Sequence, residues 1–202
     1  MNTEPSGSRL ERQIEFILEI DKLKQVFRQT YLLDRSRKEN DAEHSWHLAM
    51  LAILFAEYAT EPDIDVQRVV KMVLIHDLVE IDAGDTFRYD EEGAKTKQKR
   101  ELAAADRIFN ILPPDQAAEI RALWDEFEAM DTPESRYAAA IDRLQPLLHN
   151  LSTEGITWRE QGVTADMVLD KNSLVAAGTP QLWEYVKTLI HEAVEKGHLK
   201  AR

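Results

Sequence analysis

A histidine and an aspartate stand side by side at His76 and Asp77, near the end of an apolar stretch, and Glu80 follows within one helical turn. Side chains three and four positions apart lie on the same side of a helix, so Glu80 is expected beside the other two. Ionisable groups among apolar ones are unfavourable unless they pair with each other or with a cation. The trio therefore indicates a bound metal ion or a mutual network, and the simple alternative is a helix end whose carboxylates are hydrated.

Two further polar side chains lie beside apolar residues that predict a core-facing surface. His44 precedes an apolar run that begins at Leu48, and Asp142 lies within the mainly apolar segment 138–144. The chain has no cysteine, which excludes disulfides, thiolate metal sites and cysteine nucleophiles. Any transition metal must therefore be held by histidine, aspartate or glutamate side chains.

The elements that position these residues are predicted to be helices. Seven glycines and seven prolines are too few for a chain of many tight turns, which favours an all-α fold over a many-stranded sheet. The segment 66–81 is apolar around much of its girth, so its helix is expected to be central. Asp41 is expected to cap the helix that follows it. Apolar residues at helical spacing predict helices over residues 10–29, 41–60, 66–81, 94–111, 115–129, 133–151 and 180–196, with a short helical piece near 165–169 in an otherwise irregular segment.

Length and composition are those of one folded, soluble domain. The chain has 202 residues, of which 44% are hydrophobic and 31% are charged. The sequence shows no internal repeat, linker or low-complexity tract. We therefore expect a single domain over residues 1–202, with a core from about 28 to 152 and a C-terminal helix from about 180 to 196.

The charge and the apolar runs restrict the partners of the chain. A formal net charge of −12 repels phosphate backbones, so no nucleic-acid partner is expected. A small phosphorylated molecule remains compatible, because a metal ion and a few basic residues can reverse the field inside a pocket. No apolar run approaches the roughly 20 residues that span a bilayer, and residues 1–9 lack the apolar region of a secretory signal. We expect no membrane partner and a cytoplasmic location.

The chemistry-bearing residues resemble those of a known family. The order His44, His76-Asp77 and Asp142 resembles the H…HD…D metal-binding pattern of the HD-domain superfamily. The neighbouring residues are similar to those of its YfbR-like branch, which contains bacterial 5′-deoxynucleotidases and their eukaryotic relatives. These neighbours are Glu39-Asn40-Asp41-Ala42-Glu43-His44-Ser45, His76-Asp77-Leu78-Val79-Glu80 and Gly84-Asp85.

The likeness extends over about residues 28–142 and has two departures. A glutamate that commonly precedes the histidine-aspartate pair is replaced by Met72, and Gln29 stands where the branch often has tryptophan. The spacing from Arg28 to Glu39 is one residue longer than in the bacterial branch. A strict preference for deoxyribose is therefore not implied.

The resemblance implies an HD-domain helical bundle that holds one divalent transition metal ion. Its ligands would be His44, His76, Asp77 and Asp142. Two imidazoles and two carboxylates suit manganese, iron, cobalt, nickel or zinc, and suit calcium poorly. Such a site leaves positions for a water and a phosphate oxygen, which is the arrangement that hydrolysis of a phosphate ester requires.

The resemblance also implies roles for residues near the metal. Glu80 would be a catalytic acid or base, with support of a metal ligand as the alternative. Asp85 would face the substrate and act in catalysis, with an ordinary acidic turn residue as the alternative. Arg28, placed near the end of the first predicted helix, would bind the substrate phosphate. Arg35 and Arg37 are rivals for that role, although solvated loop charges are the simpler interpretation of both.

Two other histidines are interpreted as structural. His47 follows His44 by one helical turn on the same face, and a core histidine is a commoner outcome there than support of a ligand or contact with a second metal. His149 shares the predicted helix of Asp142 but lies seven residues away.

The activity implied by the family is hydrolysis of (deoxy)nucleoside 5′-monophosphates to nucleoside and phosphate. The enzymatic alternatives are another phosphomonoester, a cyclic nucleotide or a guanosine polyphosphate, because one fold hosts several functions. The non-enzymatic alternative is a metal-dependent regulator that senses nucleotides. A homodimer is expected from the family and from the frequency of two-fold dimers.

Overall fold

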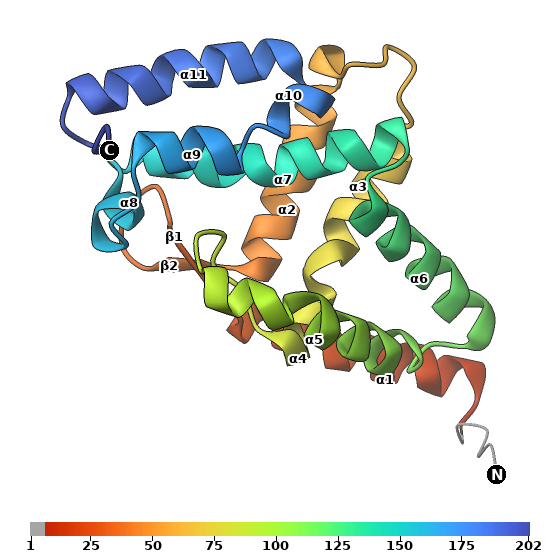
Figure 1. Cartoon of the computed structure of the whole chain (residues 1–202). Helices are drawn as coiled ribbons and strands as arrows, with labels where there is room; N and C mark the ends of the chain where they lie inside the picture. The colour runs from red at the N-terminus through yellow and green to blue at the C-terminus, as the bar shows by residue number, and fades with distance from the viewer. Residues whose placement is uncertain (1–6) are drawn as a thin grey trace.

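The computed structural model describes residues 7–202 and consists mainly of helices, which confirms the predicted all-α class (Figure 1). Its α-helices are α1 (Arg9–Ile20), α2 (Asp41–Leu54), α3 (Val66–Ile75), α4 (Glu80–Ala83), α5 (Glu91–Phe109), α6 (Pro114–Ala129), α7 (Pro133–Ser152), α8 (Ile156–Glu160), α9 (Ala165–Lys171), α10 (Val175–Gly178) and α11 (Pro180–Glu195). Three 3₁₀ helices, η1 (Asp21–Gln25), η2 (Ala56–Tyr58) and η3 (His76–Val79), and the strands β1 (Phe27–Tyr31) and β2 (Lys38–Asn40) complete the described elements.

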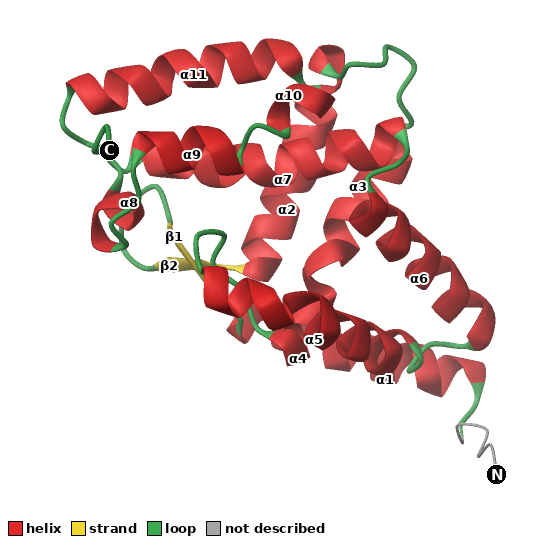
Figure 2. Ribbon diagram, in the orientation of Figure 1, coloured by secondary structure: helices red, strands yellow, loops and turns green. Residues whose placement is uncertain are grey.

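The first helix predicted from the sequence, over residues 10–29, is correct only in its first half. Helix α1 ends at Ile20, and the chain turns through η1 into β1, which pairs antiparallel with β2. Figure 2 shows this two-stranded sheet at one end of α2. Phe27 pairs with Asn40 and Tyr31 with Lys38, so the strand depends on its pairing with the segment that follows the next loop. Arg28 consequently lies on a strand, and not near the end of a helix.

Helix α2 begins with a reciprocal cap. The side chain of Asn40, and not that of Asp41 as predicted, accepts a hydrogen bond from the backbone N–H of Glu43 at 2.9 Å. The carboxylate of Glu43 accepts one from the backbone N–H of Asn40 at 3.1 Å. The cap fixes the first turn, which carries His44. The helix ends at Leu54, which is earlier than the predicted end near residue 60.

The predicted continuous helix over 66–81 is interrupted where the chemistry-bearing residues begin. Helix α3 ends at Ile75, and His76 and Asp77 lie on η3 before α4 resumes at Glu80. The backbone carbonyl of His76 accepts a hydrogen bond from the Trp124 indole at 3.2 Å, so it is withdrawn from the regular helical ladder. Gly84, with φ of +74°, ends α4.

The later helices agree closely with the predicted ranges, with one exception. Helices α5, α6, α7 and α11 cover the segments predicted to be helical between residues 94 and 196. The segment 152–178, predicted to be irregular apart from residues 165–169, instead forms α8, α9 and α10. Val168 and Val175 from this segment are fully buried against the core, which stabilises these short helices.

The core forms where α2, α3 and α7 pack together. Leu48, Met72 and Ile141, one from each helix, are fully buried there. Figure 1 shows α2 and α3 running from the level of α7 down to the level of α5. The predicted metal ligands lie on α2, on α7 and on η3, which directly follows α3. The packing of these three helices in the core therefore holds their backbones in place. Within residues 7–202, none of the helices has the length and apolar character needed to cross a bilayer.

Candidate metal centre and pocket

The four predicted metal ligands come together although they are far apart in the sequence. His44 extends from α2, His76 and Asp77 from η3, and Asp142 from α7. His44 Nε2 lies 3.1 Å from Asp142 Oδ1 and 3.9 Å from Asp77 Oδ2. His76 Nε2 lies 3.0 Å from Asp77 Oδ1 and 3.7 Å from Asp142 Oδ1. The two nitrogens and the carboxylate oxygens therefore face one small volume.

Hydrogen bonds on the far side of each imidazole turn a lone pair toward this volume. His44 Nδ1 donates to the side-chain oxygen of Gln145 at 3.0 Å, and His76 Nδ1 donates to the backbone carbonyl of Val73 at 2.9 Å. When both rings are neutral, each has its single N–H at Nδ1 and its lone pair at Nε2. Buried metal-binding histidines are commonly oriented in this way.

The donor set fits a cation. His76 Nε2 is buried and has no hydrogen-bond partner. Burial and the nearby Arg28 charge lower the pKa of His44 to about 4, so its ring is neutral at physiological pH. Its Nε2 lone pair then faces an Asp142 oxygen at 3.1 Å with no hydrogen between them. A divalent ion bound by both atoms would relieve that repulsion.

The charges around the centre also favour a positive ion. Burial alone would lower the pKa of His76. The nearby Asp77 and Asp142 outweigh this effect and raise the pKa to about 9. Burial alone raises the pKa of Asp142, but its contacts with His44 and His76 bring it well below the usual range. Asp142 is therefore ionised, and the two carboxylates draw positive charge to the point between the imidazoles.

A pocket of about 840 Å³, partly open to solvent, adjoins the centre. Three of the predicted ligands, His76, Asp77 and Asp142, line it together with Glu80 and Asp85. A ligand that fills the pocket therefore contacts the centre directly.

Glu80 and Asp85, the predicted catalytic acids, both lie at the pocket. Glu80 is 4% exposed, and its Oε2 atom has no hydrogen-bond partner. One carboxylate oxygen each from Asp41, Asp77 and Glu80 lie within 4.8 Å of one another. Burial and the neighbouring Asp77 raise the pKa of Glu80 well above its ordinary value, and burial raises the pKa of Asp85. Both positions agree with a role beside the substrate.

Arg28, the predicted phosphate ligand, lies at the pocket although its predicted helix is wrong. Its Nη1 atom donates to Asp77 Oδ2 at 3.0 Å and to Asp41 Oδ1 at 3.3 Å. The guanidinium therefore contacts a predicted metal ligand and faces the same space as the acids. The rivals lie elsewhere, because Arg35 pairs with a surface glutamate at 2.8 Å and Arg37 with another at 2.8 Å.

Several residues that the sequence did not single out also line the pocket. Arg143 presents buried Nε and Nη1 atoms that have no hydrogen-bond partner among the described residues. Its burial and the positive charge of the nearby Arg88 lower its pKa to about 10. Arg88 and Lys97 add two further cationic side chains, which lie among the acidic residues of the lining: Asp77, Glu80, Asp85, Glu101, Glu128 and Asp142. The apolar part of its wall consists of Phe87, Tyr89, Phe127, Pro146, Leu147 and Trp158.

A signal for one missed residue was present in the sequence. Asp142, Gln145 and His149 are spaced by three and four positions, which places all three on one face of α7. Gln145 is fully buried and sets the ring orientation of His44. Helical spacing counted from Asp142 would have identified it.

Comparisons with known proteins agree with this site. A family model described as the HD domain matches residues 20–183. The 5′-deoxynucleotidase HDDC2 of Homo sapiens is 26% identical over 144 residues, which are 71% of this chain and 69% of the relative. The 5′-deoxynucleotidase hdd1 of Schizosaccharomyces pombe is 28% identical over 113 residues, which are 54% and 55% of the two chains.

Solved structures extend the comparison to nearly the whole chain. A predicted metal-dependent phosphohydrolase from Magnetospirillum magnetotacticum is 54% identical, covers 96% of both chains and superposes with a TM-score of 0.91. A conserved hypothetical protein from Pyrococcus furiosus, 22% identical over 90% of this chain and 99% of its own, shares the fold with a TM-score of 0.60. The family match and the first of these structures together show that the chain belongs to the HD domain family.

Proposed function

We propose that the protein is a metal-dependent phosphohydrolase that converts (deoxy)nucleoside 5′-monophosphates to nucleoside and phosphate. The observation that carries this proposal is the convergence of two imidazoles and two carboxylates beside a pocket that four cationic side chains line. The relatives named 5′-deoxynucleotidase support the substrate class. In this proposal, residues 1–202 form a single domain.

The proposed cofactor is one divalent ion of manganese, iron, cobalt, nickel or zinc, held by His44, His76, Asp77 and Asp142. When bound, such an ion polarises a phosphoryl group and lowers the pKa of a coordinated water. The mixed nitrogen and oxygen donor set is the reason for this choice of metals.

The substrate phosphate is proposed to meet the cationic side chains of the pocket. Arg28 and Arg143 offer planar guanidinium groups that match phosphate oxygens, and Lys97 adds a point charge. Asp85 faces the substrate at the pocket floor. Glu80, whose raised pKa favours the protonated form, is placed to give a proton to the leaving 5′-oxygen. Phe87 and Tyr89, with ring centroids 5.2 Å apart, offer an apolar wall for the nucleoside.

A panel of phosphate esters tests the proposal. Purified protein loaded with Mn²⁺ or Co²⁺ is expected to release phosphate from dAMP, dGMP and AMP, and to lose that activity when a chelator removes the metal. Readdition of either metal should restore it. Cleavage of cyclic AMP or a guanosine polyphosphate alone would contradict the nucleotide assignment, and tight nucleotide binding without any turnover would point to a regulator.

We also propose that the protein is a cytoplasmic homodimer. Helix α1 exposes an apolar stripe at Leu10, Ile14, Ile17 and Leu18, whose exposed fractions are 64%, 50%, 62% and 68%. An exposed apolar stripe of this kind is common at protein interfaces. Light scattering should therefore give about twice the 23.2 kDa of one chain, and Leu18→Glu should shift it toward one chain. Leu33→Glu, at a residue that is 53% exposed, is the control. A wild-type mass of one chain would overturn the dimer.

A further inference from the structure

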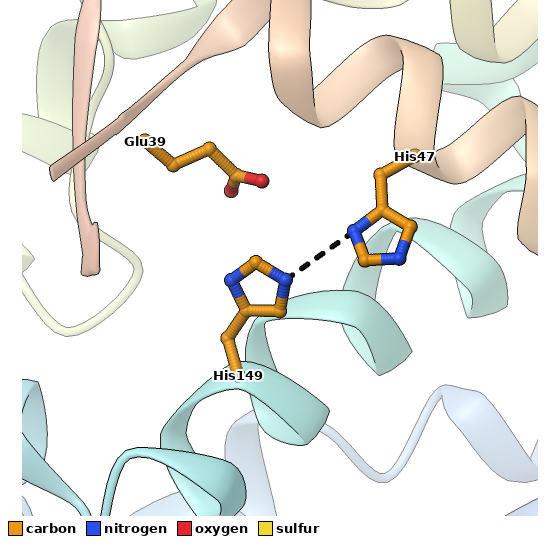
Figure 3. A group of neighbouring side chains, drawn as sticks. All are labelled: Glu39, His47 and His149. Atoms are coloured by element: carbon orange, nitrogen blue, oxygen red, sulfur yellow. Dashed lines mark hydrogen bonds between the residues drawn. The ribbon is translucent and has the colours of Figure 1, made fainter. Parts of the chain in front are cut away.

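A second group of metal-ligating side chains lies behind the first centre. Glu39 on β2, His47 on α2 and His149 on α7 bring one ligand atom each within 4.8 Å of one another (Figure 3). None of the three belongs to the first centre. Gln145 separates the two groups, because its side-chain oxygen faces His44 and its amide nitrogen faces the second group.

The two imidazoles of this group turn one ring nitrogen each toward the other, at hydrogen-bond distance. His149 Nδ1 donates to the backbone carbonyl of Tyr31 at 3.1 Å, which leaves Nε2 as an acceptor. His149 Nε2 lies 3.3 Å from His47 Nδ1, and Figure 3 shows both rings turned toward this contact.

The carboxylate of Glu39 completes the group and is only partly satisfied. The residue is 2% exposed, and its Oε2 atom has no hydrogen-bond partner. Figure 3 shows the carboxylate pointing toward the two histidines. A buried carboxylate with a free oxygen is unfavourable unless a cation or a further donor approaches it.

The hydrogen bonds available within the group do not satisfy all of its acceptors. The amide nitrogen of Gln145 lies 2.7 Å from Glu39 Oε1, 3.1 Å from His149 Nε2 and 3.3 Å from His47 Nδ1. An amide carries two hydrogens, so it serves at most two of these three atoms. When His47 carries its proton on Nε2, the three residues present one acceptor atom each to a common point, which is the arrangement that a cation requires.

We propose that Glu39, His47 and His149 bind a second divalent cation, of the transition-metal class that imidazole and carboxylate ligands prefer. The 3.3 Å between His47 Nδ1 and His149 Nε2 agrees with two ligands that each lie about 2.1 Å from one ion in near-tetrahedral geometry. His47 is half-buried and offers the route to solvent.

Binding at this site must involve Gln145, because an amide N–H is repelled by a cation. The side chain has to turn its oxygen toward the ion or move aside. Either movement disturbs its hydrogen bond with His44, so the second ion is expected to bind more weakly than the first. The inference goes beyond the proposed function and does not depend on it.

Cobalt binding to a chain without the first centre tests the proposal. The double variant His76→Ala, Asp77→Ala is titrated with Co²⁺, and bound metal is counted by elemental analysis and visible absorption. This variant is expected to retain about one Co²⁺ per chain, and adding His47→Ala or His149→Ala should remove it. Adding His191→Ala, whose side chain is 78% exposed, should change nothing. If the protein still binds this Co²⁺ after His47→Ala and also after His149→Ala, the proposed second site is wrong.

The same test in a chain whose first centre is intact covers the case in which the double variant fails to fold. Circular dichroism and thermal melting verify each variant, and His47→Ala is the milder change because that residue is half-buried. In the otherwise native chain at saturating Co²⁺, His47→Ala should lower the bound metal by about one ion per chain, while His191→Ala leaves it unchanged. If the native chain binds only as much Co²⁺ as the His47→Ala variant, no second site exists.

Discussion

Replacing Asp77 with alanine is expected to lower kcat/KM for nucleotide hydrolysis about a thousandfold. Asp77 lies 3.0 Å from His76 Nε2 and accepts a hydrogen bond from Arg28 at 3.0 Å, so it links the proposed metal to the proposed phosphate ligand. Metal-ion catalysis contributes several kcal/mol, and a loss of about 4 kcal/mol corresponds to about a thousandfold in rate. Phosphate release from dAMP at saturating Mn²⁺ measures the effect.

Asp82→Ala is the matched control for this substitution. Asp82 is a nearby acid on α4, but its carboxylate pairs with Arg107 at the surface and does not line the pocket. It should keep nearly full activity and one tightly bound metal. Should the Asp77→Ala protein hold its metal and keep a tenth or more of the activity, Asp77 would not be a ligand and the proposed centre would be wrong.

The residues at this centre could be predicted because their types carry chemical information. Histidine and aspartate among apolar residues are costly unless something compensates them, and this cost is visible in the sequence at His76 and Asp77. The resemblance then supplied His44 and Asp142 as their partners. In the structure, each of the four side chains lies within 4 Å of at least one of the others.

The elements around the centre were less predictable where long-range contacts override local preference. The segment that contains Arg28 has apolar spacing compatible with a helix, yet it forms a strand because residues 38–40 pair with it. The break after Ile75 depends on the Trp124 indole, which is 48 residues away from the carbonyl it binds. Neither partner can be identified from a local window of sequence.

The basic side chains of the pocket were missed for a different reason. Arg88, Lys97 and Arg143 occur in stretches of mixed charge, where most such residues are solvated. Only the fold shows that they surround one cavity. The net charge of −12 is compatible with an anionic substrate, because these cationic side chains and a bound metal ion would act on it at short range.

Replacing Glu80 with glutamine is expected to lower kcat by between about a hundredfold and ten-thousandfold, the range for loss of a positioned acid or base. Glutamine keeps the size and the hydrogen-bonding capacity of the side chain but has no proton to give. Glu80 is suited to this role because it is 4% exposed, lines the pocket and leaves Oε2 without a protein partner. Single-turnover phosphate release measures the chemical step directly.

Metal dependence separates catalysis by Glu80 from support of a ligand. If Glu80 only orients Asp77, its loss should weaken metal binding by about 10- to 100-fold, and excess Mn²⁺ should restore the rate. If Glu80 transfers a proton, the variant should bind metal normally and stay slow at any Mn²⁺ concentration. Glu92→Gln, at a side chain that is 83% exposed, is the control and should match the wild type. Full rescue of Glu80→Gln by added metal would exclude the catalytic role, since metal occupancy cannot replace a missing proton donor.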